Sequence, residues 1–198
     1  ANTDQVTLAL HTDKISFSVI DGNTTTVEYV TTQVLRDTSA WYHIVVSGDT
    51  SLGSPLFKVY LNGSQVTAFS TSTNSAAQNL DTEANNTVVH RIGERAFSSS
   101  QPFDGYLAES VLINGSALEP TSFAEYDPTG TFWVPKSPTV IKALTFGSNG
   151  FYLDNATNAQ TDAGSEGNNF TNNNTVVTVA NHTPTSLQPV FNPLFRNA

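Results

Sequence analysis

The stretch Trp41-Tyr-His-Ile-Val-Val46 constrains the fold more than any other part of this chain. Its residues are aromatic or β-branched, and both sets of alternating side chains are largely apolar. A strand that is apolar on both sides is typically central in a two-sheet sandwich, where both of its faces are covered. The chain returns through Phe57–Leu61 to Asn62-Gly63, a dipeptide that predicts a type I′ hairpin turn. This unit therefore predicts an architecture rather than a reaction centre.

Other segments extend the prediction of strands along the chain. Residues 6–10, 14–19 and 26–31 alternate between apolar and polar side chains, with the turn Asp21-Gly22-Asn23 between the last two. Such alternation predicts strands of one antiparallel sheet with one wet face. Further strands are expected at residues 87–93, 107–113, 141–146 and 151–153. Only 13% of residues are charged, whereas Thr, Ser and Asn are abundant. The predicted class is therefore all-β, a two-sheet antiparallel sandwich.

Two segments lack the pattern of a packed domain. Ser70–Asn86 is rich in Ser, Thr, Asn and Ala, and it predicts a long surface loop. After Asp154 the composition shifts to Asn, Thr, Gly and Pro, so we expect a sandwich over residues 1–154 and an extended arm, partly strand, over 155–198. The arm carries an apolar cluster, Phe191, Leu194 and Phe195, that predicts docking. Docking on the chain's own domain and docking on a neighbouring subunit both stay open.

Charge and composition exclude several classes of function. Seventeen acidic and eight basic residues give a net charge of −9 without any Lys/Arg cluster, so neither nucleic acid nor an anionic membrane is an expected partner. No run approaches the roughly 20 apolar residues of a membrane-spanning helix. The absence of Cys excludes disulfides and thiolate chemistry. No nucleophile elbow, P-loop or dinucleotide motif occurs.

Titratable side chains suggest two kinds of site in the sequence. Glu109 shares the alternation of the predicted strand 107–113, which places a carboxylate among apolar neighbours. It could be a general acid, but a structural ion pair with Arg91 or His43 is favoured because the strand carries no second carboxylate. Trp41, His43, Arg91 and Glu109 are therefore predicted to be structural core residues. We expect no cofactor, although calcium stays an alternative because four aspartates lie in polar loops, namely Asp49, Asp104, Asp127 and Asp154.

Several motifs, in this order, resemble laminin-G-like, concanavalin-A-like jelly rolls. They are Val30–Val46, Tyr60-Leu-Asn-Gly-Ser-Gln-Val66, Arg91-Ile-Gly93 and Phe103-Asp-Gly-Tyr-Leu-Ala-Glu109. A second set is similar to virion structural proteins of tailed, often aquatic, bacteriophages. That set comprises Pro120–Asp127, Trp133-Val-Pro-Lys136, Asn149–Asp154 and Gly167-Asn-Asn-Phe170. Together the two sets cover about residues 1–175.

The resemblance implies a non-enzymatic virion protein that decorates the capsid or forms part of a tail or fibre. Its implied partners are other virion proteins or further copies of itself. The alternative is a lectin-like adhesin that binds glycans through loops around Ser70–Asn86 and Phe97–Gln101. Related chains carry strands upstream of the part that matches Ala1, so we expect a neighbour to complete the sandwich, or this chain to be a fragment or processed product. Glucanases of the wider fold use alternating carboxylates on one strand, whereas Glu109 stands alone.

Overall fold

The computed structural model describes residues 4–94, 102–154 and 160–172. These residues form antiparallel β-sheets, two 3-10 turns (η) and one short α-helix. The elements in chain order are β1 (Gln5–His11), β2 (Lys14–Asp21), β3 (Thr24–Thr31), β4 (Ile44–Asp49), β5 (Leu56–Leu61), β6 (Ser64–Gln65), β7 (Phe69–Asn74), η1 (Glu83–Asn85), β8 (Ser110–Leu112), η2 (Pro120–Ser122), β9 (Ala124–Tyr126), β10 (Trp133–Pro135), α1 (Pro138–Lys142) and β11 (Phe151–Leu153). The predicted all-β class is confirmed.

The first sheet has the strand order β1-β2-β3-β7. Side chains of β2 alternate between the two faces of this sheet. Ile15, Phe17 and Val19 are buried, whereas the serines between them are only partly buried. The three predicted N-terminal strands are confirmed, and so is the turn between β2 and β3. Gly22 and Asn23 adopt φ values of 56° and 62° there, the left-handed conformation of a tight hairpin.

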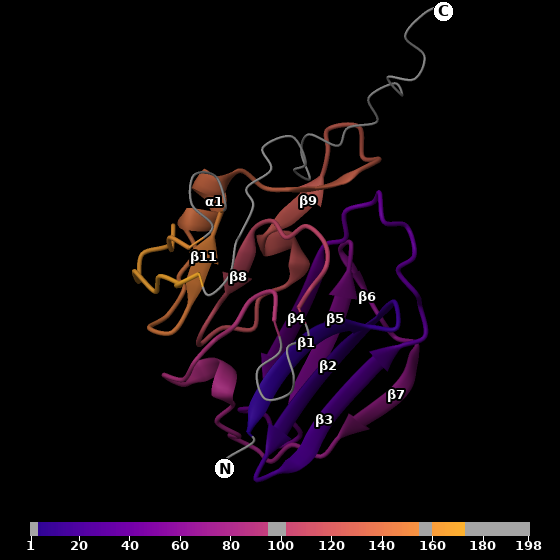
Figure 1. The fold of residues 1–198 in the computed structure, drawn as a ribbon, viewed down its shortest axis with the longest axis vertical. Helices are drawn as coiled ribbons and strands as arrows, with labels where there is room; N and C mark the ends of the chain where they lie inside the picture. Colours follow the sequence, from indigo (N-terminus) through magenta and orange to yellow (C-terminus); the bar gives the residue numbers. More distant parts are fainter. Residues whose placement is uncertain (1–3, 95–101, 155–159, 173–198) are drawn as a thin grey trace, which may run out of the picture.

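The second sheet has the order β4-β5-β6 and packs over the first. Phe57, Val59 and Leu61 on β5 form one buried cluster with Ile15, Phe17, Val19 and Val27 of the first sheet. The rings of Phe17 and Phe57 lie 5.7 Å apart across this core. The two sheets thus form the sandwich, seen in the lower part of Figure 1.

The stretch 41–46 differs from its prediction in two respects. The strand begins at Ile44 and runs to Asp49, and β4 lies at the edge of its sheet, with Ile44–Val46 only partly buried. The reason is the length of its partner. Strand β5 ends at Leu61, opposite Ile44, and the chain then turns at Asn62-Gly63. Residues 41–43 therefore have no strand to pair with.

Three further predictions of elements were wrong. Residues 69–74 form β7 on the edge of the first sheet, because backbone pairing with β3 needs no large side chain. Residues 87–93 form no strand, and Val88, Val89 and Ile92 are exposed. Residues 141–146 contain the end of α1, since Pro138 at the first helical turn favours a helix start.

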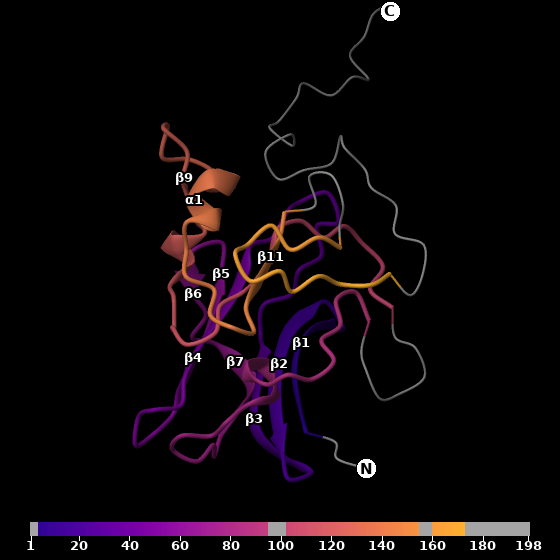
Figure 2. The same cartoon turned by 90° about the vertical axis from the view of Figure 1, so that its left-hand side faces the viewer.

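A further set of elements packs at one end of the sandwich. Strand pairs β8–β11 and β9–β10 and helix α1 surround a second apolar cluster built on Ile141, Phe146 and Tyr152. Figures 1 and 2 both place β9, β11 and α1 at the end of the molecule opposite β3 and β7. Residues 160–172 pack onto this set, with the Phe170 ring 4.9 Å from that of Phe151.

The C-terminal docking residues Phe191, Leu194 and Phe195 lie outside the described residues, so their docking stays a prediction. The expectation that a neighbour completes the sandwich also stays a prediction. Among the described residues, β1 is paired with β2 alone. The described part of the chain holds no helix long and apolar enough to cross a membrane.

Candidate functional site

A shallow groove lies beside the β5–β6 hairpin. Its volume is about 440 Å³, and it runs between the end of β3 and the hairpin. The residues that line it are Thr32, Gln33, Leu61, Asn62, Ser64, Gln65, Val66, Thr67 and Ala68. None of these described lining residues is charged, and six carry an amide or hydroxyl side chain. Such a surface offers hydrogen bonds to a neutral polar ligand.

The Asn62-Gly63 turn sets one end of the groove. Asn62 and Gly63 have φ values of 47° and 81°, which confirms the predicted I′-type backbone. Trp133 of β10 lies directly against Gly63, where a Cβ atom would come within 2.8 Å of the indole ring. Tyr126 of β9 meets Trp133 edge to face at 5.2 Å and is 58% exposed. A pair of aromatic rings therefore stands against the turn that contains the groove residue Asn62.

His43 connects the turn to Trp133. Its backbone N–H donates to Asn62 Oδ1 and its carbonyl accepts from the Asn62 N–H, both at 2.8 Å. The indole Nε1–H of Trp133 donates to His43 Nδ1 at 3.0 Å. Because the indole can only donate, Nδ1 is an acceptor and the neutral ring carries its proton on Nε2. Burial lowers the pKa of His43, which favours this neutral form.

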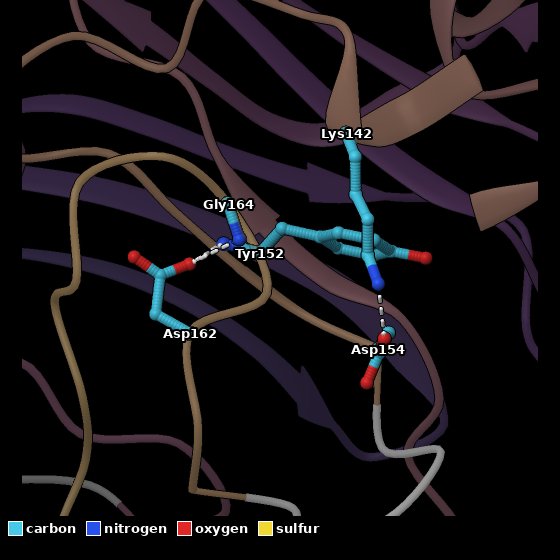
Figure 3. A network of polar contacts seen from close by, with 5 residues as sticks. All are labelled: Lys142, Tyr152, Asp154, Asp162 and Gly164. Carbon is cyan, nitrogen blue, oxygen red and sulfur yellow. Dashed lines mark hydrogen bonds and ion pairs between the residues drawn. The ribbon is translucent and has the colours of Figure 1, made fainter. Parts of the chain in front are cut away.

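A second polar group surrounds Tyr152 on β11 (Figure 3). Lys142 Nζ contacts Asp154 Oδ2 at 3.0 Å, in front of the Tyr152 ring. The Tyr152 hydroxyl is buried and has no hydrogen-bond partner among the described residues. Burial, followed by the nearby carboxylates of Glu109 and Asp154, raises its pKa. Burial, and then the charge of Asp154, also raises the pKa of Glu109.

This second group has little access to a substrate. Tyr152 is completely buried, and Asp154 is engaged by Lys142. Glu109 precedes β8 with a φ of 52°, a left-handed conformation that L-residues seldom adopt. The group is a partly enclosed cluster in which the Lys142–Asp154 ion pair lies near a second carboxylate, that of Glu109.

The four predicted core residues are not brought together. Arg91 is exposed, and its Nη1 lies 3.6 Å from Glu94 Oε2 rather than near Glu109. The His43 ring accepts from the indole of Trp133, and Trp41 is partly buried three residues before β4. Glu109 lies just before β8, outside the strand whose alternation placed it in the core. The charge that shifts its pKa is that of Asp154, and neither expected cation contributes.

The loop aspartates bond the protein itself. Asp49 accepts from the Ser51 hydroxyl and N–H, and hydrogen bonds to Ser51 lower its pKa. Asp127 accepts from the N–H groups of Thr131 and Phe132. Asp104 is exposed. Within the described ranges, no three His, Asp or Glu side chains gather to hold a metal ion.

Comparison with known families agrees with this architecture. A family model of the laminin-G type, described as the concanavalin A-like lectin/glucanases superfamily, matches residues 1–122. The chain belongs to this superfamily. Neither the curated proteins nor the solved structures contain a match to the sequence.

In this concanavalin A-like domain, the matched segment ends at Ser122, before β9. Trp133 and Tyr126, which lie beside the Asn62-Gly63 turn, therefore come from beyond the family match. Sequence reasoning missed the groove, since Gln33 and Gln65 are far apart in the chain and carry no motif. The one signal was Gly63, because a hairpin glycine suits a position that a bulky ring approaches closely.

Proposed function

We propose that this chain is a non-enzymatic structural domain of a bacteriophage virion, which decorates or stabilises the capsid or forms part of a tail or fibre. Its partners are other virion proteins or further copies of the chain. One observation carries the proposal. The segments that resemble phage virion proteins, although spread over residues 120–170, form one interlocked unit at the end of the sandwich.

Hydrogen bonds around Asp162 hold this unit together. The Asp162 carboxylate accepts from the backbone N–H groups of Tyr152, Gly164 and Asn168, each at 2.8 Å, and Figure 3 shows the first two. The Asn168 side chain donates to the Gly150 carbonyl at 2.8 Å. These bonds tie residues 162–168 to β11 and its preceding turn.

Interlocking of this kind supports a structural role. Residues of the motifs that resemble phage proteins, such as Gly150 and Phe170, make their contacts inside the protein. At Gly150 a Cβ atom would lie 2.1 Å from the Phe146 carbonyl, so only glycine fits. Their chemistry is that of packing and of backbone hydrogen bonding, as a rigid assembly unit requires.

Locating the chain in an imaged virion tests the proposal. We expect density for the sandwich on the capsid surface or the tail, and deletion of residues 183–198 should abolish incorporation into particles. Full incorporation of the truncated chain would refute docking of the arm on a neighbouring subunit. Absence of the chain from purified virions would refute the virion role itself.

The groove favours a second function, the binding of neutral glycans. Amide and hydroxyl groups of Gln33, Gln65 and Thr67 can exchange hydrogen bonds with sugar hydroxyls. The rings of Trp133 and Tyr126 lie beside the turn that contains Asn62. A glycan array, run with calcium and with a chelator, tests it. If no glycan binds either with calcium or with the chelator, this second function is refuted. If a glycan binds the wild type and Gln78→Ala but not the double variant Gln33→Ala/Gln65→Ala, its binding site is the groove.

A further inference from the structure

We propose that Asn114-Gly115 is a self-modifying site, at which the asparagine side chain converts spontaneously to aspartate or isoaspartate, and that this conversion loosens η1 from the turns packed against it. The reaction takes place within the chain and uses only water. The proposal stands independently of the virion role and of the glycan groove.

The chemistry belongs to Asn-Gly dipeptides. Glycine has no Cβ atom, so its backbone nitrogen can closely approach the side-chain carbon Cγ of the preceding asparagine. A bond forms between that nitrogen and Cγ, the Cγ–Nδ2 bond breaks, and Nδ2 leaves as ammonia with the proton of the glycine N–H. Water then opens the five-membered imide at either carbonyl, which gives aspartate or isoaspartate.

The chain contains three Asn-Gly dipeptides, and two of them share one local sequence. Asn62-Gly-Ser64 and Asn114-Gly-Ser116 are the same tripeptide, and each follows an aliphatic residue. The third dipeptide, Asn149-Gly150, is followed by Phe151. Local sequence therefore gives Asn62 and Asn114 similar intrinsic rates of conversion. A difference between them in the folded protein must come from the fold.

Asn149 is the best protected of the three asparagines. The Gly150 N–H donates to the Gly147 carbonyl at 2.9 Å, and Gly150 is buried. Asn149 Nδ2 donates to the backbone carbonyl of Asn85. The attacking nitrogen and the leaving nitrogen are therefore both engaged in hydrogen bonds to the backbone.

Asn62 is held by the backbone on one side and by an aromatic ring on the other. Its Oδ1 accepts from the His43 N–H at 2.8 Å, which ties the side chain to the backbone just before β4. Gly63 lies against the indole of Trp133, where an added Cβ atom would come within 2.8 Å. Cyclisation turns both the Asn62 side chain and the peptide bond to Gly63, so it must break the first contact and displace the ring.

Asn114 has neither constraint. Gly115 is exposed, and no atom lies within 4 Å of a Cβ atom added to it. The one hydrogen bond that the Asn114 side chain makes within the described residues runs from Nδ2 to Oδ1 of Asn85, at 3.0 Å. Asn85 is itself exposed. This dipeptide therefore combines an open glycine with a side chain that only another surface side chain holds.

Asn85 gives the conversion a structural consequence. This last residue of η1 accepts from Nδ2 of both Asn114 and Asn149, so it ties η1 to the turn after β8 and to the turn before β11. The carboxylate that conversion leaves at position 114 has no N–H to donate, and it faces the Asn85 oxygen as acceptor against acceptor. After conversion, η1 keeps one of these two hydrogen bonds.

Ageing of the full chain in mildly alkaline buffer, followed by trypsin digestion and mass spectrometry, tests the site. Cleavage after Lys and Arg places the three dipeptides in separate peptides, 59–91, 96–136 and 143–196, and Asn114 is the only asparagine of the second. In the folded protein Asn114 should convert about tenfold faster than Asn62, which must also leave the His43 backbone and displace Trp133.

Unfolding by urea supplies the matched control. There the two identical tripeptides should convert at similar rates, because local sequence alone remains. If Asn114 converts no faster than Asn62 in the folded protein, the proposal is overturned. A difference of the same size in urea would also overturn it, since the fold would then not be the cause.

Hydrogen exchange tests the loosening of η1. In Asn114→Asp the backbone N–H groups of Asn85 and Asn86 should exchange about threefold or more faster than in the wild type, because one hydrogen bond to Asn85 is lost. Asn62→Asp makes the same change in the other tripeptide and keeps Oδ1 as an acceptor, so exchange at η1 should stay as in the wild type. Aged wild-type protein gives the comparison without a substitution. Unchanged exchange in both Asn114→Asp and the aged protein would overturn the proposal, and so would an equal increase in Asn62→Asp.

Discussion

At the scale of single residues, Glu109 illustrates how a predicted ion pair became a site of repulsion. Its raised pKa means that the folded protein favours the neutral carboxyl. Stability from this group is therefore fully present below its ordinary pKa of 4.5 and is lost as pH rises through the folded-state value. At neutral pH the charged form weakens the fold.

Glu109→Gln should stabilise the protein at pH 7 by about 0.5–1 kcal/mol, a modest amount because the carboxyl is partly exposed and its interactions are screened. The difference should vanish below pH 4. Glu119→Gln is a control of opposite sign, because hydrogen bonding to Tyr60 lowers the pKa of Glu119. Denaturant unfolding at both pH values measures the effect, and a destabilised Glu109→Gln at pH 7 would contradict the explanation.

His43 supplies a second prediction at this scale. Its folded-state pKa is lowered, so the unfolded chain takes up the proton first as pH falls below 6.5. The associated stability should be lost between 6.5 and the lower folded-state value. Trp133→Phe removes the indole donor and should weaken this pH dependence. Titration of the His43 ring by NMR, with unfolding measured in parallel, checks both. A His43 pKa at or above 6.5 would refute the neutral assignment.

At the scale of elements, the β5–β6 turn depends on the contact between Gly63 and Trp133. Gly63→Ala should destabilise the protein by more than the cost of about 1–2 kcal/mol for a left-handed Ala, because the ring of Trp133 must also move. Gly22→Ala is a matched control, with a positive φ and no atom within 4 Å of the added Cβ. Thermal unfolding compares the two, and equal losses would mean that the Trp133 contact is unimportant.

Asp162 holds the element 160–172 against β11. Asp162→Ala should cost about 2–4 kcal/mol, since the buried N–H of Tyr152 loses its acceptor. Asp162→Asn keeps one oxygen and should cost less. Asp49→Ala changes a solvent-exposed carboxylate at the end of β4 and should change stability far less than either. Urea unfolding gives the three values. If Asp162→Ala and Asp49→Ala have the same free energy of unfolding, the hydrogen bonds that Asp162 accepts contribute little to stability.

At the scale of the whole molecule, sequence patterns predicted the parts with regular alternation. Strands β1, β2, β3 and β5 and the Asn62-Gly63 turn followed from period-two patterns and turn chemistry. Sequence patterns failed where strand formation depends on a pairing partner that is distant in the chain. The polar segment β7 is a strand because it pairs with the edge of β3. Val88 and Val89 are apolar, but they pair with no described strand. The groove was beyond prediction because Gln33 and Gln65, which are 32 residues apart, come together only in the fold.

The Asp162 carboxylate couples β11 to the segment that follows it, because one side chain accepts from the N–H groups of Tyr152, Gly164 and Asn168. Segments that share buried hydrogen bonds tend to open as one cooperative unit. The three N–H groups should therefore exchange with solvent deuterium at similar rates, and loss of the Asp162 carboxylate should speed the exchange of all three together.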